Sequence, residues 1–170
     1  DIKIVDDILK DIENVSVANY NCPGQIVITG AKEEVKMAGE RLLDAGARRV
    51  VPLNVSGPFH SSMLKEAGDR LEKVLEDIEI FPLKIPCVTN VTGEYINDIA
   101  KTKDLLKRQV YEPVLFQQGI ENMINSGVNT FVEIGPGKTL TGFIRKINKE
   151  VTVYNIETLS DMEKVIMGLQ

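Results

Sequence analysis

The sequence predicts an α/β fold, and two observations support this prediction. From residue 83 onward, short β-type apolar runs alternate with helical patterns, which is typical of a parallel or mixed sheet covered on both faces. In the first 55 residues the expected order is helix, strand, strand, helix, strand. That order matches a ferredoxin-like β-α-β-β-α-β unit whose first strand is missing.

The first 55 residues are expected to form five elements. Apolar residues at Ile4, Ile8 and Ile12 fall on one face of a helix. A Pro-Gly turn joins two strands in a hairpin, and Gly46 suits the end of a second helix. The expected ranges are helix 2–13, strands 15–20 and 25–30, helix 32–45 and strand 48–55.

The rest of the chain is expected to alternate between helices and strands. The helix expected at 104–110 stops before Pro113, because the residue before a proline disfavours helical geometry. We divide the chain into two units, residues 1–55 and 56–170. The expected ranges in the second unit are helix 61–78, strand 87–90, helices 104–110 and 117–125, strand 130–134, helix 138–148, strand 151–156 and helix 160–169.

Composition excludes several classes of protein. The net charge is −5 and the basic residues are scattered, which argues against nucleic-acid binding. There is no apolar run of 18 residues and no signal peptide, so we expect a cytoplasmic protein without a membrane span. With one histidine and two distant cysteines, Cys22 and Cys87, we expect no metal site. Both cysteines are interpreted as reduced thiols, with Cys22 partly exposed in a turn.

The single histidine, His60, lies between an expected strand and an expected helix. On local geometry alone, a helix-capping or loop role is favoured over catalysis. The positive end of the following helix disfavours the imidazolium, which suits a general base. Ser61 and Ser62 are poor nucleophiles because first-turn hydroxyls usually cap, and no G-x-S-x-G is present. A serine partner for His60 would therefore have to lie outside this sequence.

A glycine-rich segment, residues 133–139, ends like a phosphate-binding P-loop. The P-loop interpretation fails because Val132 stands where its first glycine is required. A plain chain reversal is favoured over an anion site at the helix N-terminus. The basic residues after it are interpreted as a solvated helix face, with a docking patch as the lesser alternative. They are Lys138, Arg145, Lys146 and Lys149.

Four segments that together span nearly the whole chain carry a resemblance to a known family. They are 21–30 (Asn-Cys-Pro-Gly-Gln-Ile-Val-Ile-Thr-Gly), 52–61 (Pro-Leu-Asn-Val-Ser-Gly-Pro-Phe-His-Ser), 108–114 (Arg-Gln-Val-Tyr-Glu-Pro-Val) and 132–140 (Val-Glu-Ile-Gly-Pro-Gly-Lys-Thr-Leu). Each segment alone is a weak signal, but the four in this order are a strong one. They resemble the family of bacterial malonyl-CoA:acyl carrier protein transacylases.

The resemblance implies an α/β-hydrolase-like large subdomain with an inserted ferredoxin-like small subdomain, and an active site between them. On this basis residues 1–55 would be most of the small subdomain and 56–170 the C-terminal part of the large one. In the family, a serine in a G-H-S-x-G turn takes malonyl from coenzyme A, and a histidine activates that serine. The malonyl group then passes to the phosphopantetheine thiol of acyl carrier protein in fatty acid synthesis. Coenzyme A thioester is the substrate, and no tightly bound cofactor is expected.

The resemblance also implies roles for individual residues. His60 matches the catalytic histidine, and Gln109 matches the residue whose carbonyl orients it. Phe59 and Asn21 are expected at the substrate; a Phe before the histidine goes with malonyl rather than methylmalonyl in related acyltransferases. Cys22 departs from the family, where a serine is common.

The larger departure is that the family's N-terminal part is absent from this sequence. The chain begins without Met, within an amphipathic pattern, and is expected to be a mature or truncated piece. We therefore expect it to be inactive alone and stable only against the missing half. The expected partners are that half, malonyl-CoA and acyl carrier protein. The alternatives are a non-catalytic module that binds the carrier protein or an anion, and an acyltransferase domain of a polyketide synthase.

Overall fold

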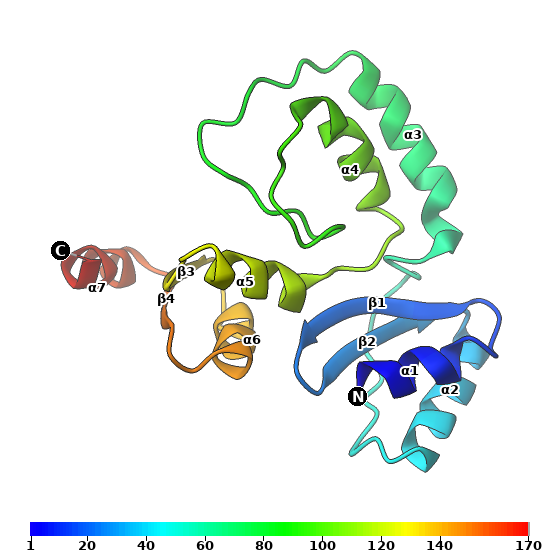
Figure 1. Ribbon diagram of the computed structural model, residues 1–170. Helices are drawn as coiled ribbons and strands as arrows, with labels where there is room; N and C mark the ends of the chain where they lie inside the picture. Colours follow the sequence, from blue (N-terminus) through cyan, green and yellow to red (C-terminus); the bar gives the residue numbers. More distant parts are fainter. Residues whose placement is uncertain (170) are drawn as a thin grey trace.

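A computed structural model, which describes residues 1–169, shows a mixed α/β arrangement in three groups of elements (Figure 1). The hairpin and two helices form the first, two antiparallel helices the second, and two parallel strands with three helices the third. The elements are α1 Ile2–Leu9, β1 Val15–Cys22, β2 Gln25–Gly30, α2 Lys32–Asp44, η1 Ser62–Leu64, α3 Lys65–Glu76, η2 Ile99–Lys101, α4 Thr102–Arg108, α5 Phe116–Asn125, β3 Thr130–Ile134, α6 Thr139–Ile147, β4 Thr152–Ile156 and α7 Leu159–Leu169.

The first group confirms the hairpin and the helix that follows it. Strands β1 and β2 pair antiparallel around a turn in which Gly24 has φ +78°. Helix α2 ends where Gly46, at φ +94°, donates its N–H to the Leu43 carbonyl at 3.0 Å. Glycine takes this left-handed conformation without steric cost, which is why it terminates the helix. The core of the group is Leu9, Ile12, Val17 and Ala38.

The strand expected at 48–55 is absent, and this prediction was wrong. The segment is irregular, and Val51, Leu53 and Val55 are 60%, 59% and 65% exposed. A strand is stabilised by its neighbours, and within residues 1–169 nothing pairs with this segment. For the same reason the strand expected at 87–90 is only a bridge between Val88 and Tyr95.

Two helices are shorter than expected. The helix expected at 2–13 ends at Leu9, and the one expected at 61–78 begins as the 3-10 turn η1 before α3 starts at Lys65.

In the second group, α3 packs against α4 (Figure 1). Lys107 on α4 bridges two carboxylates of α3, with Nζ 3.0 Å from Asp69 and 2.7 Å from Glu72. Gly68 allows the close approach, because a Cβ there would lie 2.7 Å from a ring carbon of Tyr111. These contacts fix the segment that follows α4.

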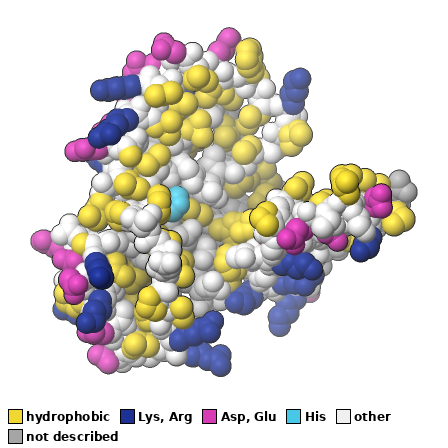
Figure 2. All heavy atoms as spheres, turned by 180° about the vertical axis from the view of Figure 1, so that it is seen from behind, with side chains coloured by type: hydrophobic (Ala, Val, Ile, Leu, Met, Phe, Trp, Pro, Cys, Tyr) yellow, Lys and Arg dark blue, Asp and Glu magenta, His cyan; other side chains and the backbone are white. Residues whose placement is uncertain are grey.

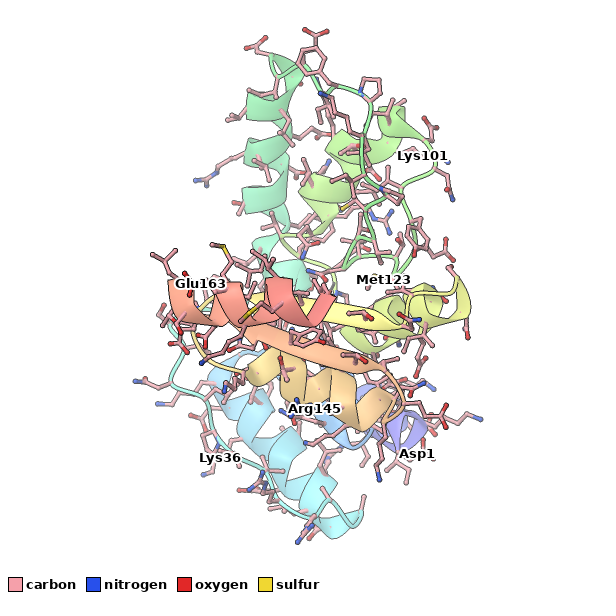
Figure 3. All side chains as sticks on the ribbon, turned by 90° about the vertical axis from the view of Figure 1, so that its left-hand side faces the viewer. Asp1, Lys36, Lys101, Met123, Arg145 and Glu163 are labelled. Carbon is pink, nitrogen blue, oxygen red and sulfur yellow. The ribbon has the colours of Figure 1, made fainter. Side chains whose placement is uncertain are left out.

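In the third group, β3 and β4 pair in parallel from Thr130–Thr152 to Ile134–Ile156. Figure 3 shows α7, with Glu163, and α6, with Arg145, on either side of the strands. The α6 side is closed by a core of Ile120, Phe131 and Ile144. On the opposite side α7 packs against β4, but β3 is open there, since Val132 and Ile134 are 37% and 79% exposed. Within residues 1–169 the expected sheet covered on both faces is therefore only partly present.

The molecule exposes more surface than a compact chain of its size. The accessible area is 11,627 Å², against about 8,300 Å² for a compact protein of this mass. Apolar side chains cover much of one side (Figure 2). Large exposed apolar residues are concentrated in segments 50–59, 78–85 and 159–169.

The N-terminus of α6 is capped by a side chain from the preceding strand. Glu133 accepts hydrogen bonds from the backbone N–H of Leu140 at 3.1 Å and of Thr141 at 2.8 Å. Burial alone would raise the pKa of this carboxyl, but the hydrogen bonds from Thr141 and Leu140 outweigh burial and hold the pKa below its usual value. The glycine turn and α6 therefore depend on an ionised Glu133.

Glu133→Gln is expected to loosen the first turn of α6. Glutamine offers one acceptor oxygen instead of two, so one N–H loses its partner at a cost of about 1 kcal/mol. Amide hydrogen exchange at Leu140 and Thr141 should become about fivefold faster. Glu150→Gln is the matched control, because Glu150 is exposed and follows α6.

The effect of Glu133→Gln should disappear in acid. Because the folded-state pKa is lowered, the stabilisation is fully present above the unfolded value of about 4.3 and is lost as the pH falls through the lower folded value. The exchange rates of wild type and variant should therefore converge at a pH well below the folded-state pKa of Glu133. If they differ there as much as at neutral pH, Glu133 does not cap α6 as an ionised carboxylate.

Candidate active site

The site is built on a tight turn that presents His60. The backbone of His60 is left-handed, with φ +59°, a conformation that side-chain-bearing residues adopt rarely. Its side chain is half-buried. Figure 2 shows it, in cyan, at the surface between the part that holds α3 and α4 and the part that holds the hairpin.

His60 and Gln109 meet although 49 residues separate them. The Nδ1 atom of His60 lies 3.1 Å from the main-chain carbonyl oxygen of Gln109. Gln109 ends α4, and carbonyl groups at a helix C-terminus have no partner within the helix. A carbonyl only accepts, so Nδ1 must carry a proton, and in the neutral imidazole Nε2 then carries the lone pair.

The imidazole lies beside a different helix end from the one that the sequence suggested. The sequence suggested the positive N-terminus of the helix that follows His60. In the structure η1 intervenes before α3, and the ring bonds the carbonyl end of α4. That end carries partial negative charge and stabilises a positive charge on the ring.

Residues on both sides of Gln109 in the sequence make contacts that restrain the segment carrying its carbonyl. Arg108 donates Nε–H and Nη2–H to the two carboxylate oxygens of Glu112, at 2.7 and 2.8 Å. Such a two-point contact fixes both side chains in one plane. Further along, Val114 exchanges main-chain hydrogen bonds with Ala18 and Tyr20 of β1, at 2.8 and 2.9 Å.

The other expected site residues lie in different surroundings. Phe59 is 54% exposed. Asn21 is buried in β1, with 8% exposed. Ser61 is 4% exposed and donates its hydroxyl to the Pro58 carbonyl at 2.7 Å, while Ser62 is exposed. Within residues 1–169, no serine or cysteine side chain bonds His60 Nε2, so neither serine is placed as its nucleophile.

Cys22 is buried, contrary to the expectation of partial exposure. It has 2% of its surface exposed at the end of β1. Burial raises the pKa of its thiol, and nearby Lys146 offsets this only in part. A buried thiol with a raised pKa is a poor nucleophile. Cys87 is exposed and also free.

The helix N-terminus after the glycine turn is already occupied. The Glu133 carboxylate accepts the N–H groups that an external anion would need, which leaves the anion-binding alternative without its site. The basic residues of α6 make internal contacts: Lys146 bonds the Gln25 side chain at 3.3 Å and Arg145 the Val153 carbonyl at 3.5 Å.

The part of the chain that the structure describes contains neither a metal-binding cluster nor a membrane-spanning helix. Residues 1–169 contain no cluster of three or more His, Cys, Asp or Glu placed to bind a metal. In the same range, no helix has the length and apolar character needed to cross a membrane.

Sequence reasoning missed two contributors to this site. The Arg108–Glu112 pair has the i, i+4 spacing that favours ion pairs on a helix, so its signal was present. The bond from Ser61 to Pro58 had no such signal, because it depends on the turn geometry.

Known proteins resemble this chain closely. A malonyl CoA-acyl carrier protein transacylase of Bacillus subtilis (strain 168) is 39% identical over 168 residues, which are 99% of this chain and 52% of that protein. A crystal structure of the transacylase of that name from Clostridium perfringens is 46% identical with a TM-score of 0.92, over 98% of this chain and 54% of its own. A malonyl-transacylase in complex with its type II PKS acyl-carrier protein is 34% identical with a TM-score of 0.90, over 98% and 53%.

This chain spans about half the length of the curated relatives that it matches. Within its own length the match is nearly complete. Residues 3–165 match the family model described as acyl transferase domain. The mixed α/β arrangement and the place of His60 occur within that matched range. The chain therefore belongs to the acyl transferase domain family.

Proposed function

We propose that this chain is the histidine-bearing part of an enzyme that transfers malonyl from coenzyme A to the phosphopantetheine thiol of acyl carrier protein, in fatty acid synthesis. The observation that supports this most directly is the 3.1 Å contact between His60 Nδ1 and the Gln109 carbonyl. It leaves Nε2 free to accept a proton, as a general base requires. The named relatives are malonyl transacylases, which supports malonyl as the acyl group.

In the first half-reaction, a serine of the N-terminal part gives its hydroxyl proton to His60 Nε2. Its oxygen bonds the malonyl carbonyl carbon, the carbon–sulfur bond to coenzyme A breaks, and the thiolate takes the proton back from Nε2. While Nε2 is protonated the ring is positive, and the Gln109 carbonyl at the end of α4 stabilises that charge.

The second half-reaction runs through the same atoms. The phosphopantetheine thiol gives its proton to Nε2, and its sulfur bonds the malonyl carbon. The serine–carbon bond breaks and the serine oxygen recovers the proton, so His60 ends as it began. A fixed tautomer serves both halves, because Nδ1 never leaves the Gln109 carbonyl.

Two further residues are proposed at the substrate. The half-exposed ring of Phe59, next to His60, would fill the space that a methyl branch on malonyl needs. Asn21 is buried at the end of β1, so its proposed role requires the cleft that forms with the N-terminal part.

The missing N-terminal part is proposed as the partner of this chain's open surfaces. The excess accessible area, the unpaired segment 48–55 and the exposed face of β3 support this. In this proposal residues 1–55 are most of a ferredoxin-like small subdomain without its first strand. Residues 56–170 are the C-terminal part of an α/β-hydrolase-like subdomain.

The isolated chain is expected to be inactive in malonyl transfer. Residues 1–169 supply a base and an orienting carbonyl but place no serine at Nε2, so the covalent step would lack its nucleophile. The measurement is the mass increase of acyl carrier protein incubated with malonyl-CoA and either the chain alone or the chain joined to an N-terminal part.

In the joined protein, His60→Ala should reduce kcat by about 10²–10⁴-fold, the usual value of a general base. Ser62→Ala is the control and should leave kcat unchanged, because its side chain is exposed. Robust turnover by the isolated chain would refute the proposal that the nucleophile lies elsewhere.

The isolated chain is also expected to lack a cooperative thermal transition. The two buried clusters found within residues 1–169 are small, and many large apolar residues are exposed instead of packed. Circular dichroism should show a broad melt for the chain alone and a sharp one once the N-terminal part is present. A sharp melt of the isolated chain would count against the proposed partner.

Phe59→Ala is expected to relax the choice of acyl group in the joined enzyme. Removing the ring opens room for a methyl branch, and a methyl group in a pocket is worth about 1–3 kcal/mol. The ratio of kcat/KM for methylmalonyl-CoA to that for malonyl-CoA should therefore rise by about 5- to 150-fold. Phe81→Ala, another exposed phenylalanine remote in sequence, is the control. An unchanged ratio in Phe59→Ala would remove Phe59 from the site.

A further inference from the structure

We infer that Ser61 is a positioning residue, whose hydroxyl holds His60 in the conformation that reaches Gln109. This inference rests on the proposed function, because it assigns a partner to the proposed base. It gives Ser61 a role that is neither the nucleophile nor the helix cap considered from the sequence. No capping hydrogen bond from its side chain is present at η1.

The first argument is the conformation of the turn. Residues 58–61 reverse the chain, and His60 lies third in the turn at φ +59°. A turn of this kind is usually closed by a hydrogen bond from the fourth N–H to the first carbonyl. Here residues 59 and 60 form such a turn, and the Pro58 carbonyl also accepts a hydrogen bond from the Ser61 hydroxyl, at 2.7 Å.

The second argument is burial. Ser61 is 4% exposed, so water does not readily replace its hydroxyl at the Pro58 carbonyl. The left-handed conformation is unfavourable for histidine, and it persists only where its surroundings impose it. The bond from Ser61 to Pro58 spans His60 and imposes that conformation.

The third argument is the geometry of the ring. The imidazole is attached to the left-handed residue itself, so a change in φ at His60 swings Nδ1 away from the Gln109 carbonyl. Without that contact the tautomer is no longer fixed and Nε2 no longer points in one direction. A displacement of about 1 Å in a catalytic group can cost about 100-fold in rate.

The decisive comparison is Ser61→Thr with Ser61→Val in the chain joined to its N-terminal part. Threonine and valine have the same shape, and only threonine keeps the hydroxyl. We expect kcat for Ser61→Val to be about 100-fold below that of Ser61→Thr, with similar KM and melting temperature. Equal kcat values would overturn the inference, and so would a valine variant that unfolds where the threonine variant folds.

If the extra methyl group prevents both variants from folding, Ser61→Ala against Ser62→Ala decides the question. Ser62 is the neighbouring hydroxyl and is exposed. A selective loss of kcat in Ser61→Ala, at an unchanged melting temperature, supports the inference. Equal activity, or unfolding of Ser61→Ala alone, overturns it.

A readout independent of malonyl transfer separates this inference from the proposed function. In ¹⁵N-labelled protein, the His60 Nδ1–H signal is identified by its loss in His60→Gln. It should persist, protected from exchange, in Ser61→Thr and vanish in Ser61→Val. If the wild type transfers no malonyl, the proposed function fails while this signal still tests the positioning; identical signals in both variants overturn it.

Discussion

Two main-chain hydrogen bonds between Val114 and β1 lie where the three groups of elements meet. They bring the segment after α4 against the hairpin, so they join the first and second groups of elements. The same segment leads directly into α5, which belongs to the third group. Gln109 lies five residues before this junction, and its position relative to His60 follows from it. The pairing of Val114, the packing of α3 on α4 and the left-handed turn at His60 together place the two residues of this long-range contact.

The orientation of the imidazole by a main-chain carbonyl has a physical consequence. A carboxylate in this position would carry a full charge and make a stronger hydrogen bond. A carbonyl at a helix end carries only partial charge, but it needs no side-chain rotamer to be held. The position of the carbonyl is fixed by the backbone that carries it, and the Arg108–Glu112 pair restrains that stretch of backbone further. The unfavourable free energy arises instead at His60, whose backbone adopts a left-handed conformation.

The elements that depend on residues close together in the chain were predictable from the sequence. The hairpin 15–30 and helix α2, with Gly46 after it, use local turn and cap signals, and they occur as expected. Strand β3 was also predicted at its observed bounds. Segment 48–55 has the residues of a strand, yet it is irregular because pairing requires a neighbour. The burial of Cys22 was missed, since exposure depends on what packs over a turn.

The sequence by itself determined the element types with strong local periodicity, the order of the family-like segments and the single histidine available as a base. These properties depend on residues close together along the chain. The contact between His60 and the Gln109 carbonyl was implied by the family resemblance, and the tertiary structure shows how the fold makes it. Only the tertiary structure decided that Glu133 occupies the N-terminus of α6 and that the Ser61 hydroxyl bonds the Pro58 carbonyl. Each of these depends on backbone dihedral angles and on packing between segments. A pattern of residue types does not contain that information, because the same residues satisfy their hydrogen bonds in many other ways until the chain is folded.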